Sequence, residues 1–347
     1  MPPTLDGMFR LLGILFTVLL AIATAVVVWP QFFHLEQTFP FAQIVAARGV
    51  VLAAFLVIAA LALLLLIAKP LRGFAASVLI VALLGAGATG AVGAVRGFGA
   101  DTLPAATEKS IRVLTWNTAG DKVSAEQIAR QILDQGADIV ALPETTEAAG
   151  EQIAVMLRDQ GRPMWVHHVQ FQPDVVDGPK SWQTTVLVST DLGEYSVIES
   201  SEEGTSNTGS VPSAVLMPVD GSGPTIVAVH AVAPRMEDME QWRSDLRWIA
   251  DQCPEGDFLL AGDFNATVDH MAGLGVDGGD MGYCRDAASR SGNGFSGTWP
   301  SSLPALLSTP IDRVMASQNW TPTGSVIIDD AGGSDHRGVV VQLEPAE

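Results

Sequence analysis

Cysteine is nearly absent from this chain, which has only Cys253 and Cys284 in 347 residues. Neither cysteine occurs in a metal-ligand spacing, which excludes a structural zinc site built on thiolates. A disulfide between them would close a loop of about 30 residues, provided that the compartment is oxidising. We expect this disulfide, with two buried free thiols as the alternative, because sequence does not give the Cα separation.

Positive charge is also scarce. The chain holds 19 Lys and Arg against 38 Asp and Glu, and the first hundred residues contain five of these bases and two of the acids. Residues 101–347 therefore carry a net charge of −22. Binding to the phosphates of nucleic acid requires clustered Lys and Arg, so this surface argues against it. A metal-dependent site stays compatible with the composition, because a bound cation dominates the field around it.

Three long segments contain no charged residue at all: 11–29, 49–68 and 73–95. Each is long enough to cross about 30 Å of hydrocarbon as a helix. We therefore predict a membrane anchor with three transmembrane helices over residues 1–96. A Gly-, Ala- and Thr-rich linker follows over 97–110, and an acidic globular domain over 111–347.

The bases beside these segments predict their orientation. Arg10 precedes the first segment, and Lys69 and Arg72 lie in the turn between the second and the third. Those ends should be cytoplasmic, which places the amino terminus inside and the globular domain outside the cytoplasmic membrane. Bases at the opposite ends make the bias modest. A cleaved first segment is an alternative, since residues 21–25 are mostly small, and it leaves the globular domain on the same side.

In the globular part, apolar strands end on polar side chains. An alternating run over 111–117 delivers Asn117 to the tip of a strand, and the strand predicted over 137–144 ends on Glu144. Helical periodicity over 124–135, with a serine N-cap and a glycine stop, separates the two. Strand, helix and strand in this order are typical of an α/β layered sheet.

The most informative stretch is LLAGDFNAT, residues 259–267. Because side chains two apart in a strand face the same side, Asp263 and Asn265 should project together at the strand's carboxyl end. An acid beside an amide suits a phosphate substrate, since the carboxylate can bind a water molecule and the amide can contact a phosphate oxygen. Other predicted strands and the closing SDHRG segment add further polar groups: His230, Asp312, Asp335 and His336.

Six segments stand in one order across residues 115–338: TWN, LPET, VAVHA, LAGDFNAT, PIDRV and SDHRG. In this order they resemble the endonuclease/exonuclease/phosphatase superfamily, which includes pancreatic deoxyribonuclease, inositol polyphosphate phosphatases and neutral sphingomyelinases. The resemblance implies a four-layer α/β sandwich of two packed mixed sheets flanked by helices. It also implies cleavage of phosphoester bonds with Mg²⁺, or with Mn²⁺ or Ca²⁺. The three apolar segments lie outside the resemblance.

The resemblance also implies a metal site. Glu144 would be the principal ligand, with Asn117 and Asp335 completing the surroundings of the metal. Oxygen ligands suit Mg²⁺, which takes one or two carboxylates together with waters and substrate phosphate. Taken alone, Glu144 fits a solvated acid at the end of a strand better than a metal ligand, and only the order of all six segments favours the functional interpretation.

Five further roles are implied by the same resemblance. Asp263 would orient or deprotonate the attacking water, and Asn265 would contact a phosphate oxygen. His336, held by Asp312, would face the scissile phosphate and donate to charge that develops on its oxygens. His230 would contact the phosphate or protonate the leaving oxygen.

The leading hypothesis is a membrane-anchored, metal-dependent phosphodiesterase or phosphatase that works outside the cytoplasmic membrane on a phospholipid or another envelope phosphoester. One alternative is an extracellular nuclease that degrades DNA. It is weakened because LPET lacks the Gln that many nucleases place before the Glu, and because no long basic insertion is present. The other alternative is a catalytically silent binding domain in a membrane complex. No particular protein partner is predicted.

Overall fold

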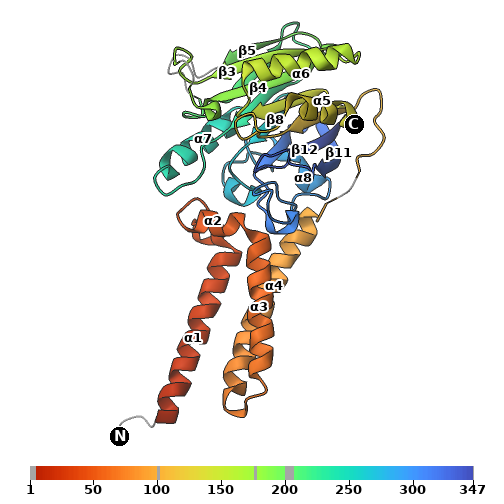
Figure 1. The fold of residues 1–347 in the computed structure, drawn as a ribbon. Coiled ribbons are helices and arrows are strands. Elements are labelled where there is room, and N and C mark those ends of the chain that lie inside the picture. The colour runs from red at the N-terminus through yellow and green to blue at the C-terminus, as the bar shows by residue number, and fades with distance from the viewer. Residues whose placement is uncertain (1–4, 100–101, 176–177, 200–206, 347) are drawn as a thin grey trace. The chain divides into compact units, whose positions relative to one another are not determined.

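Apolar helices make up most of the first of two compact units, Met1–Val95 and Arg96–Glu347. The computed structural model describes residues 5–99, 102–175, 178–199 and 207–346. The long helices of the first unit are α1 (Leu5–Val28), α3 (Arg48–Leu65) and α4 (Arg72–Arg96) (Figure 1). Shorter helices lie between them: η1 (Pro30–Phe33), α2 (Phe41–Ala46) and η2 (Lys69–Leu71). The three expected apolar helices are present, and each is long and apolar enough to cross a membrane.

Two six-stranded sheets form the second unit. The first sheet has the spatial order β11 (Trp320–Ile327), β12 (Val339–Pro345), β1 (Ile111–Thr115), β2 (Ile139–Pro143), β4 (Gln183–Ser189) and β3 (Met164–Gln170). The second has the order β5 (Tyr195–Glu199), β6 (Ala214–Pro218), β7 (Thr225–His230), β8 (Phe258–Asp263), β10 (Asp312–Ala316) and β9 (Arg285–Asp286). The pairs β1–β2 and β7–β8 are parallel and the other pairs are antiparallel, so both sheets are mixed, as expected.

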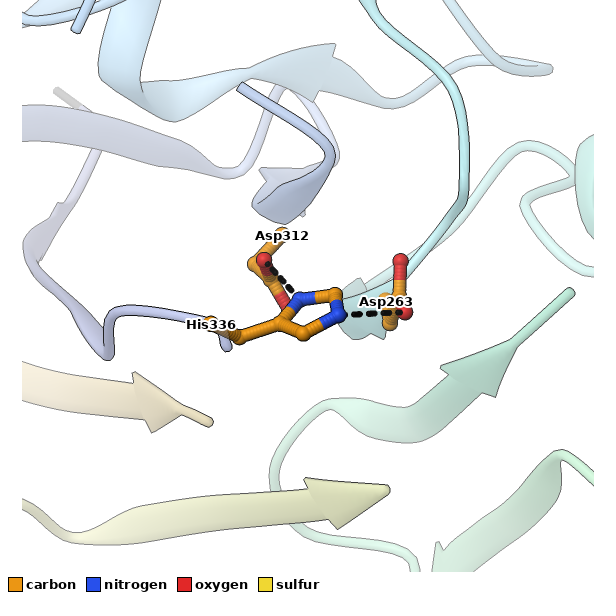
Figure 2. Close-up of side chains that lie close together, drawn as sticks. All are labelled: Asp263, Asp312 and His336. Carbon is orange, nitrogen blue, oxygen red and sulfur yellow. Dashed lines mark hydrogen bonds and ion pairs between the residues drawn. The ribbon is translucent and has the colours of Figure 1, made fainter. Parts of the chain in front are cut away.

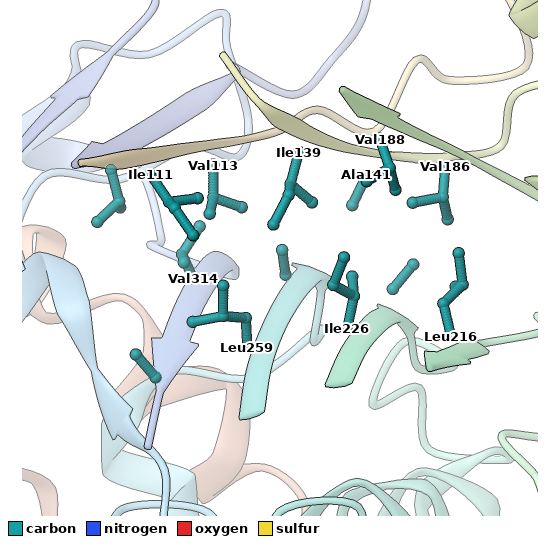
Figure 3. Packing of buried hydrophobic residues seen from close by; sticks show 14 of the residues in the cluster. Ile111, Val113, Ile139, Ala141, Val186, Val188, Leu216, Ile226, Leu259 and Val314 are labelled. Atoms are coloured by element: carbon teal, nitrogen blue, oxygen red, sulfur yellow. The ribbon is translucent and has the colours of Figure 1, made fainter. Parts of the chain in front are cut away.

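The main core lies between the two sheets. Val113, Ile139 and Val186 from the first sheet face Ile226 and Leu259 from the second, and all five are fully buried (Figure 3). Successive residues of β1 alternate between this core and a second one, because neighbouring side chains in a strand point to opposite faces. Burying such side chains contributes about 1.5–3 kcal/mol each to folding.

Helices cover the sheets and complete the layers. The outer face of the first sheet packs against α5 (Ala125–Gln135) and α6 (Glu147–Asp159), which bury Ile128 and Ile153 respectively. The sequence signals for α5 act as expected, since its N-cap serine accepts from the third residue beyond it and the glycine stop is left-handed. The remaining helices are η3 (Lys180–Trp182), η4 (Thr190–Leu192), α7 (Met239–Asp251), η5 (Val268–Met271), α8 (Ala287–Arg290) and η6 (Ala305–Leu307).

The last two strands, β11 and β12, pair antiparallel at one side of the first sheet. β12 follows the SDHRG segment and is the second strand of its sheet, between the edge strand β11 and β1. Its first residues, Val339, Val340 and Val341, are all buried, so the strand lacks the polar–apolar alternation that marks a half-exposed strand.

Cys253 and Cys284 form the expected disulfide, with Cα atoms 5.9 Å apart. Both cysteines are fully buried. The bond connects Cys253, two residues after the end of α7, to Cys284, which directly precedes β9. The two are 31 residues apart, a loop whose closure in the unfolded chain is worth about 3–4 kcal/mol of stability in the chain-entropy model. Such a bond is typical of proteins that fold in an oxidising compartment.

Candidate active site

Three polar side chains of the second sheet lie in register on neighbouring strands. His230 is the last residue of β7, Asp263 is the last residue of β8, and the two are paired in the parallel ladder. Asp312, the first residue of the antiparallel strand β10, is paired with Asp263 from the other side. The strand ends therefore place an imidazole and two carboxylates side by side at one edge of the sheet, all of them buried.

The first sheet supplies Asn117 and Glu144 to the same place. Both follow parallel strands, β1 and β2, whose carboxyl ends meet at one edge. The Asn117 amide donates to Asp263 Oδ2 at 3.0 Å and to Glu144 Oε1 at 3.3 Å, and so connects the polar ends of the two sheets. The amide nitrogen faces the carboxylates, while Asn117 Oδ1 accepts from the Ala119 N–H. This geometry makes Asn117 a bridge between two acids, one of which, Glu144, belongs with Asn117 to the metal ligand set implied by the resemblance.

His336 lies between two acids (Figure 2). Its Nδ1 is 2.8 Å from Asp312 Oδ2, and its Nε2 is 3.9 Å from Asp263 Oδ2. The backbone of His336 is held as well, because its N–H donates to Ser334 Oγ and its carbonyl accepts from the Trp116 indole. The imidazole is therefore fixed in orientation on both sides.

Charge in this cluster favours a protonated imidazole. Burial opposes protonation, but the nearby charges of Asp312 and Asp263 raise the pKa of His336 to about 10. Burial, together with the charge of Asp312, raises the pKa of Asp263 to about 7. At neutral pH the cluster thus holds a histidinium ion beside a carboxyl group that exchanges protons in that range. A base is most effective when its pKa lies near the working pH, so Asp263 suits the role of accepting a proton from water.

His230 has the opposite electrostatics. It is buried, its Nε2 is 3.9 Å from Glu144 Oε1, and its Nδ1 has no hydrogen-bond partner among the described residues. Burial, with the positive charge of His336, lowers the pKa of His230 to about 3. A neutral imidazole of this kind is a poor acid at pH 7. Of the two roles expected for His230, the structure favours contact with a phosphate over protonation of the leaving oxygen.

Asn265 holds Asp263 in place. Its N–H donates to Asp263 Oδ1 at 2.8 Å, and its amide donates to the Ala231 carbonyl at 2.9 Å and to Asp263 Oδ2 at 3.3 Å. The two side chains lie together as expected, but through a turn and not through strand alternation, because β8 ends at Asp263 and Asn265 has φ +45°. In this arrangement the amide hydrogens are used within the protein, so the phosphate contact expected of Asn265 requires them to be released.

Backbone strain occurs at two of these residues. Glu144 has φ +59° and Asn265 has φ +45°. Both values lie in the left-handed region that residues other than glycine seldom adopt. Such conformations cost about 1–3 kcal/mol and persist where surrounding contacts fix them. Hydrogen bonds do so here, because the Glu144 N–H donates to the Gln183 carbonyl and the Glu144 carbonyl accepts from Thr118.

Asp335 is exposed beside this cluster. Its Oδ2 accepts from the Trp299 indole at 3.1 Å, and its carbonyl accepts from the Ser301 N–H. Burial raises the pKa of Glu144, the amide of Asn117 counteracts this, and the negative charge of Asp335 raises that pKa further. The two carboxylates are thus close enough to repel each other.

A divalent metal fits the acids of this site in two ways. Atoms of Asp263, Asp312 and His336 lie within 4.8 Å of one another, so this group could hold an ion. However, both nitrogens of His336 already face carboxylates, and its raised pKa keeps the proton that a metal would have to displace. Glu144 and Asp335 instead offer only oxygen atoms, which Mg²⁺ prefers, and a cation would relieve their repulsion. We therefore favour this pair of acids.

Several supporting residues carry no signal of their role in the sequence. Trp116 and Ser334 lie inside the quoted motifs and Thr118 directly follows TWN, but their contacts depend on strands far apart in the chain. Trp299 lies outside the quoted motifs, and nothing in its local sequence indicates a bond to a residue 36 positions away.

Comparison with known proteins agrees with this geometry. A sequence model described as the endonuclease/exonuclease/phosphatase family matches residues 114–336. No curated protein matches the chain in sequence.

Several solved structures are similar in fold. An endonuclease/exonuclease/phosphatase protein from Beutenbergia cavernae is 19% identical, with a TM-score of 0.53, over 69% of this chain and 72% of that one. Truncated Caenorhabditis elegans TDP2 is 16% identical, with a TM-score of 0.48, over 68% and 98%. A mannosyl-6-phosphatase from Bacteroides thetaiotaomicron is 14% identical, with a TM-score of 0.48, over 67% and 99%.

Proposed function

Because this chain belongs to the endonuclease/exonuclease/phosphatase family, we propose that it is a membrane-anchored phosphoester hydrolase that depends on a divalent metal, Mg²⁺ in the first instance. The observation that carries the proposal is the buried cluster in which His336 is bonded to Asp312 and faces Asp263. A structural ion pair needs one acid for one base. This histidine has two acids, and Asn117 links one of them to Glu144.

Each group has a role in hydrolysis. Glu144 and Asp335 would hold the metal, whose charge would offset the negative charge of the phosphate oxygens. His336 in its protonated form donates to a phosphate oxygen, and this bond strengthens as charge develops there. Asp263 accepts a proton from the water that attacks phosphorus, while neutral His230 contacts the phosphate. Asp312, which is bonded to His336 Nδ1, keeps the imidazole oriented.

We further propose that the catalytic unit lies outside the cytoplasmic membrane and acts on a phospholipid or another envelope phosphoester. Three helices long and apolar enough to span a bilayer support the anchoring, and Arg10, Lys69 and Arg72 support the orientation. The disulfide supports an oxidising compartment. An anchored site meets headgroups at high local concentration, which favours a substrate within the envelope.

An assay of the full chain in lipid nanodiscs tests the activity. With Mg²⁺ we expect hydrolysis of phospholipid and of bis(4-nitrophenyl) phosphate, lost on chelation by EDTA and restored by added Mg²⁺, with plasmid DNA left intact. Asp263→Asn serves as the inactive control. If the wild-type chain nicked plasmid DNA and the Asp263→Asn variant did not, the protein would instead be a nuclease. If the wild-type chain hydrolysed none of the three substrates, it would be a silent binding domain.

A reporter fusion tests the topology. A reporter that is active only outside the cytoplasmic membrane should be active when it is fused after Glu347 and inactive when it is fused at Pro70, because Lys69 and Arg72 retain that turn in the cytoplasm. Activity of each fusion is measured in whole cells and normalised to the amount of fusion protein. The reverse pattern would place the catalytic unit in the cytoplasm and remove the reason for an envelope substrate.

A further inference from the structure

A loop over residues 298–309 borders the candidate active site on the side of its exposed acid. Thr298 Oγ1 accepts from the N–H of Asp312, and the Trp299 indole donates to Asp335 Oδ2. The loop therefore contacts two of the residues to which the site assigns chemistry. It returns on itself through paired backbone bonds between Trp299 and Thr309.

This loop is held firmly. The buried Arg337, which follows His336, donates through its guanidinium to the carbonyls of Ser301 and Leu303 and to Ser308 Oγ. Ser301 also donates to the carbonyl of Ser334. The shape of the loop is thus fixed by the same segment that carries the catalytic histidine.

The fixed loop presents apolar side chains to solvent. Trp299, Leu303 and Leu306 are 40%, 39% and 47% exposed, and we call these three residues the apolar lip. Single exposed apolar residues are common, but these three fall within eight residues of one firmly held loop beside a polar site, and a concentration of exposed apolar side chains marks binding sites.

We propose that the apolar lip binds the hydrocarbon part of a phosphoester substrate whose phosphate lies beside Asp335, so that the site selects amphiphilic phosphoesters over polar ones. This inference rests on the proposed function. The position of the lip supports a substrate as its ligand. Trp299 is both part of the lip and a hydrogen-bond donor to Asp335, so the lip adjoins the place proposed for the phosphate. Charge supports it too. Residues 101–347 have a net charge of −22, which repels anionic esters, and apolar contact supplies attraction that this field does not weaken.

Two phosphodiesters that differ only in chain length test the lip: methyl and hexyl 4-nitrophenyl phosphate. Complete burial of one CH₂ contributes about 0.8 kcal/mol, or roughly fourfold in kcat/KM. Partial contact along the five additional CH₂ groups should favour the hexyl ester by roughly tenfold or more. In a Leu303→Ser, Leu306→Ser double variant of the full chain, we expect this ratio to fall below about threefold. Release of 4-nitrophenolate gives both rates.

Val219→Ser is the matched control. Val219 is 59% exposed, and it follows β6 at the end of the sheet away from His230 and Asp263. This variant should keep the wild-type ratio. An equal ratio in the wild type and the lip variant would overturn the proposal. If the lip variant changed only the oligomeric state in light scattering, the lip would be a contact between copies of this chain.

Binding gives the same comparison without catalysis. Hexylphosphonate should bind the wild-type chain at least about tenfold more tightly than methylphosphonate in calorimetry, and the lip variant should lose this preference. A chain that binds with the preference but hydrolyses neither ester would contradict the proposed hydrolase and leave the lip supported. Hydrolysis of both esters at equal kcat/KM, with equal binding of both phosphonates, would support the proposed hydrolase and contradict the proposed role of the lip.

Discussion

Glu144→Gln should lower kcat by at least roughly a thousandfold, the equivalent of several kcal/mol of charge stabilisation by a bound cation. The substitution removes one negative charge from the pair of acids that we assign to the metal. It keeps an oxygen atom in position to accept from the Asn117 amide, which in the wild-type chain donates to Glu144 Oε1 at 3.3 Å. The fold should therefore survive, with a thermal midpoint close to that of the wild type. Turnover of bis(4-nitrophenyl) phosphate over a range of Mg²⁺ concentrations measures the loss.

Glu147→Gln is the appropriate control for this change. Glu147 lies three residues further along the chain, in the first turn of α6, and it is exposed. The same loss of charge there should leave turnover within about twofold, since exposed surface substitutions are usually worth within about 0.5 kcal/mol. If Glu144→Gln retained wild-type turnover at limiting Mg²⁺, the metal ligand would have to be sought in the Asp263, Asp312 and His336 group.

The gathering of the site residues was predictable because it follows from strand direction. Parallel strands end at a common edge, so polar residues that follow β1 and β2, or end β7 and β8, must come together. Asp263 and Asn265 also meet, but strand alternation is not the reason, because β8 ends at Asp263 and Asn265 has a left-handed backbone. The gathering at the strand ends needs only local sequence and one rule of sheet geometry.

Features that depend on surroundings could not be predicted from sequence. The neutral state of His230 results from burial, which depends on both sheets at once. The amides of Asn117 and Asn265 point their nitrogens at acids because those acids lie there in the folded chain. The strand β12, which lies inside its sheet between β11 and β1, is not marked by a pattern either, since a strand buried on both faces shows no alternation.

His336→Ala should lower kcat about 10³- to 10⁴-fold, and Asp312→Asn should come close to the same loss. His336 Nδ1 is 2.8 Å from Asp312 Oδ2. An Asn amide at that position turns an N–H toward the ring nitrogen, which favours the wrong tautomer and removes the charge that keeps the imidazole protonated. The interaction that is lost stabilises mainly the transition state, so kcat and kcat/KM should fall together. Both are measured at saturating Mg²⁺.

The double variant decides whether the two residues act as one unit. Once His336 is absent, Asp312 has no imidazole to orient, so Asp312→Asn combined with His336→Ala should be little slower than His336→Ala alone. Asp335→Asn should differ in kind, with its loss partly recovered at high Mg²⁺, because that side chain is assigned to the metal. Losses that multiply in the double variant would show that Asp312 and His336 act independently, and Asp312 would then need a role of its own at the phosphate.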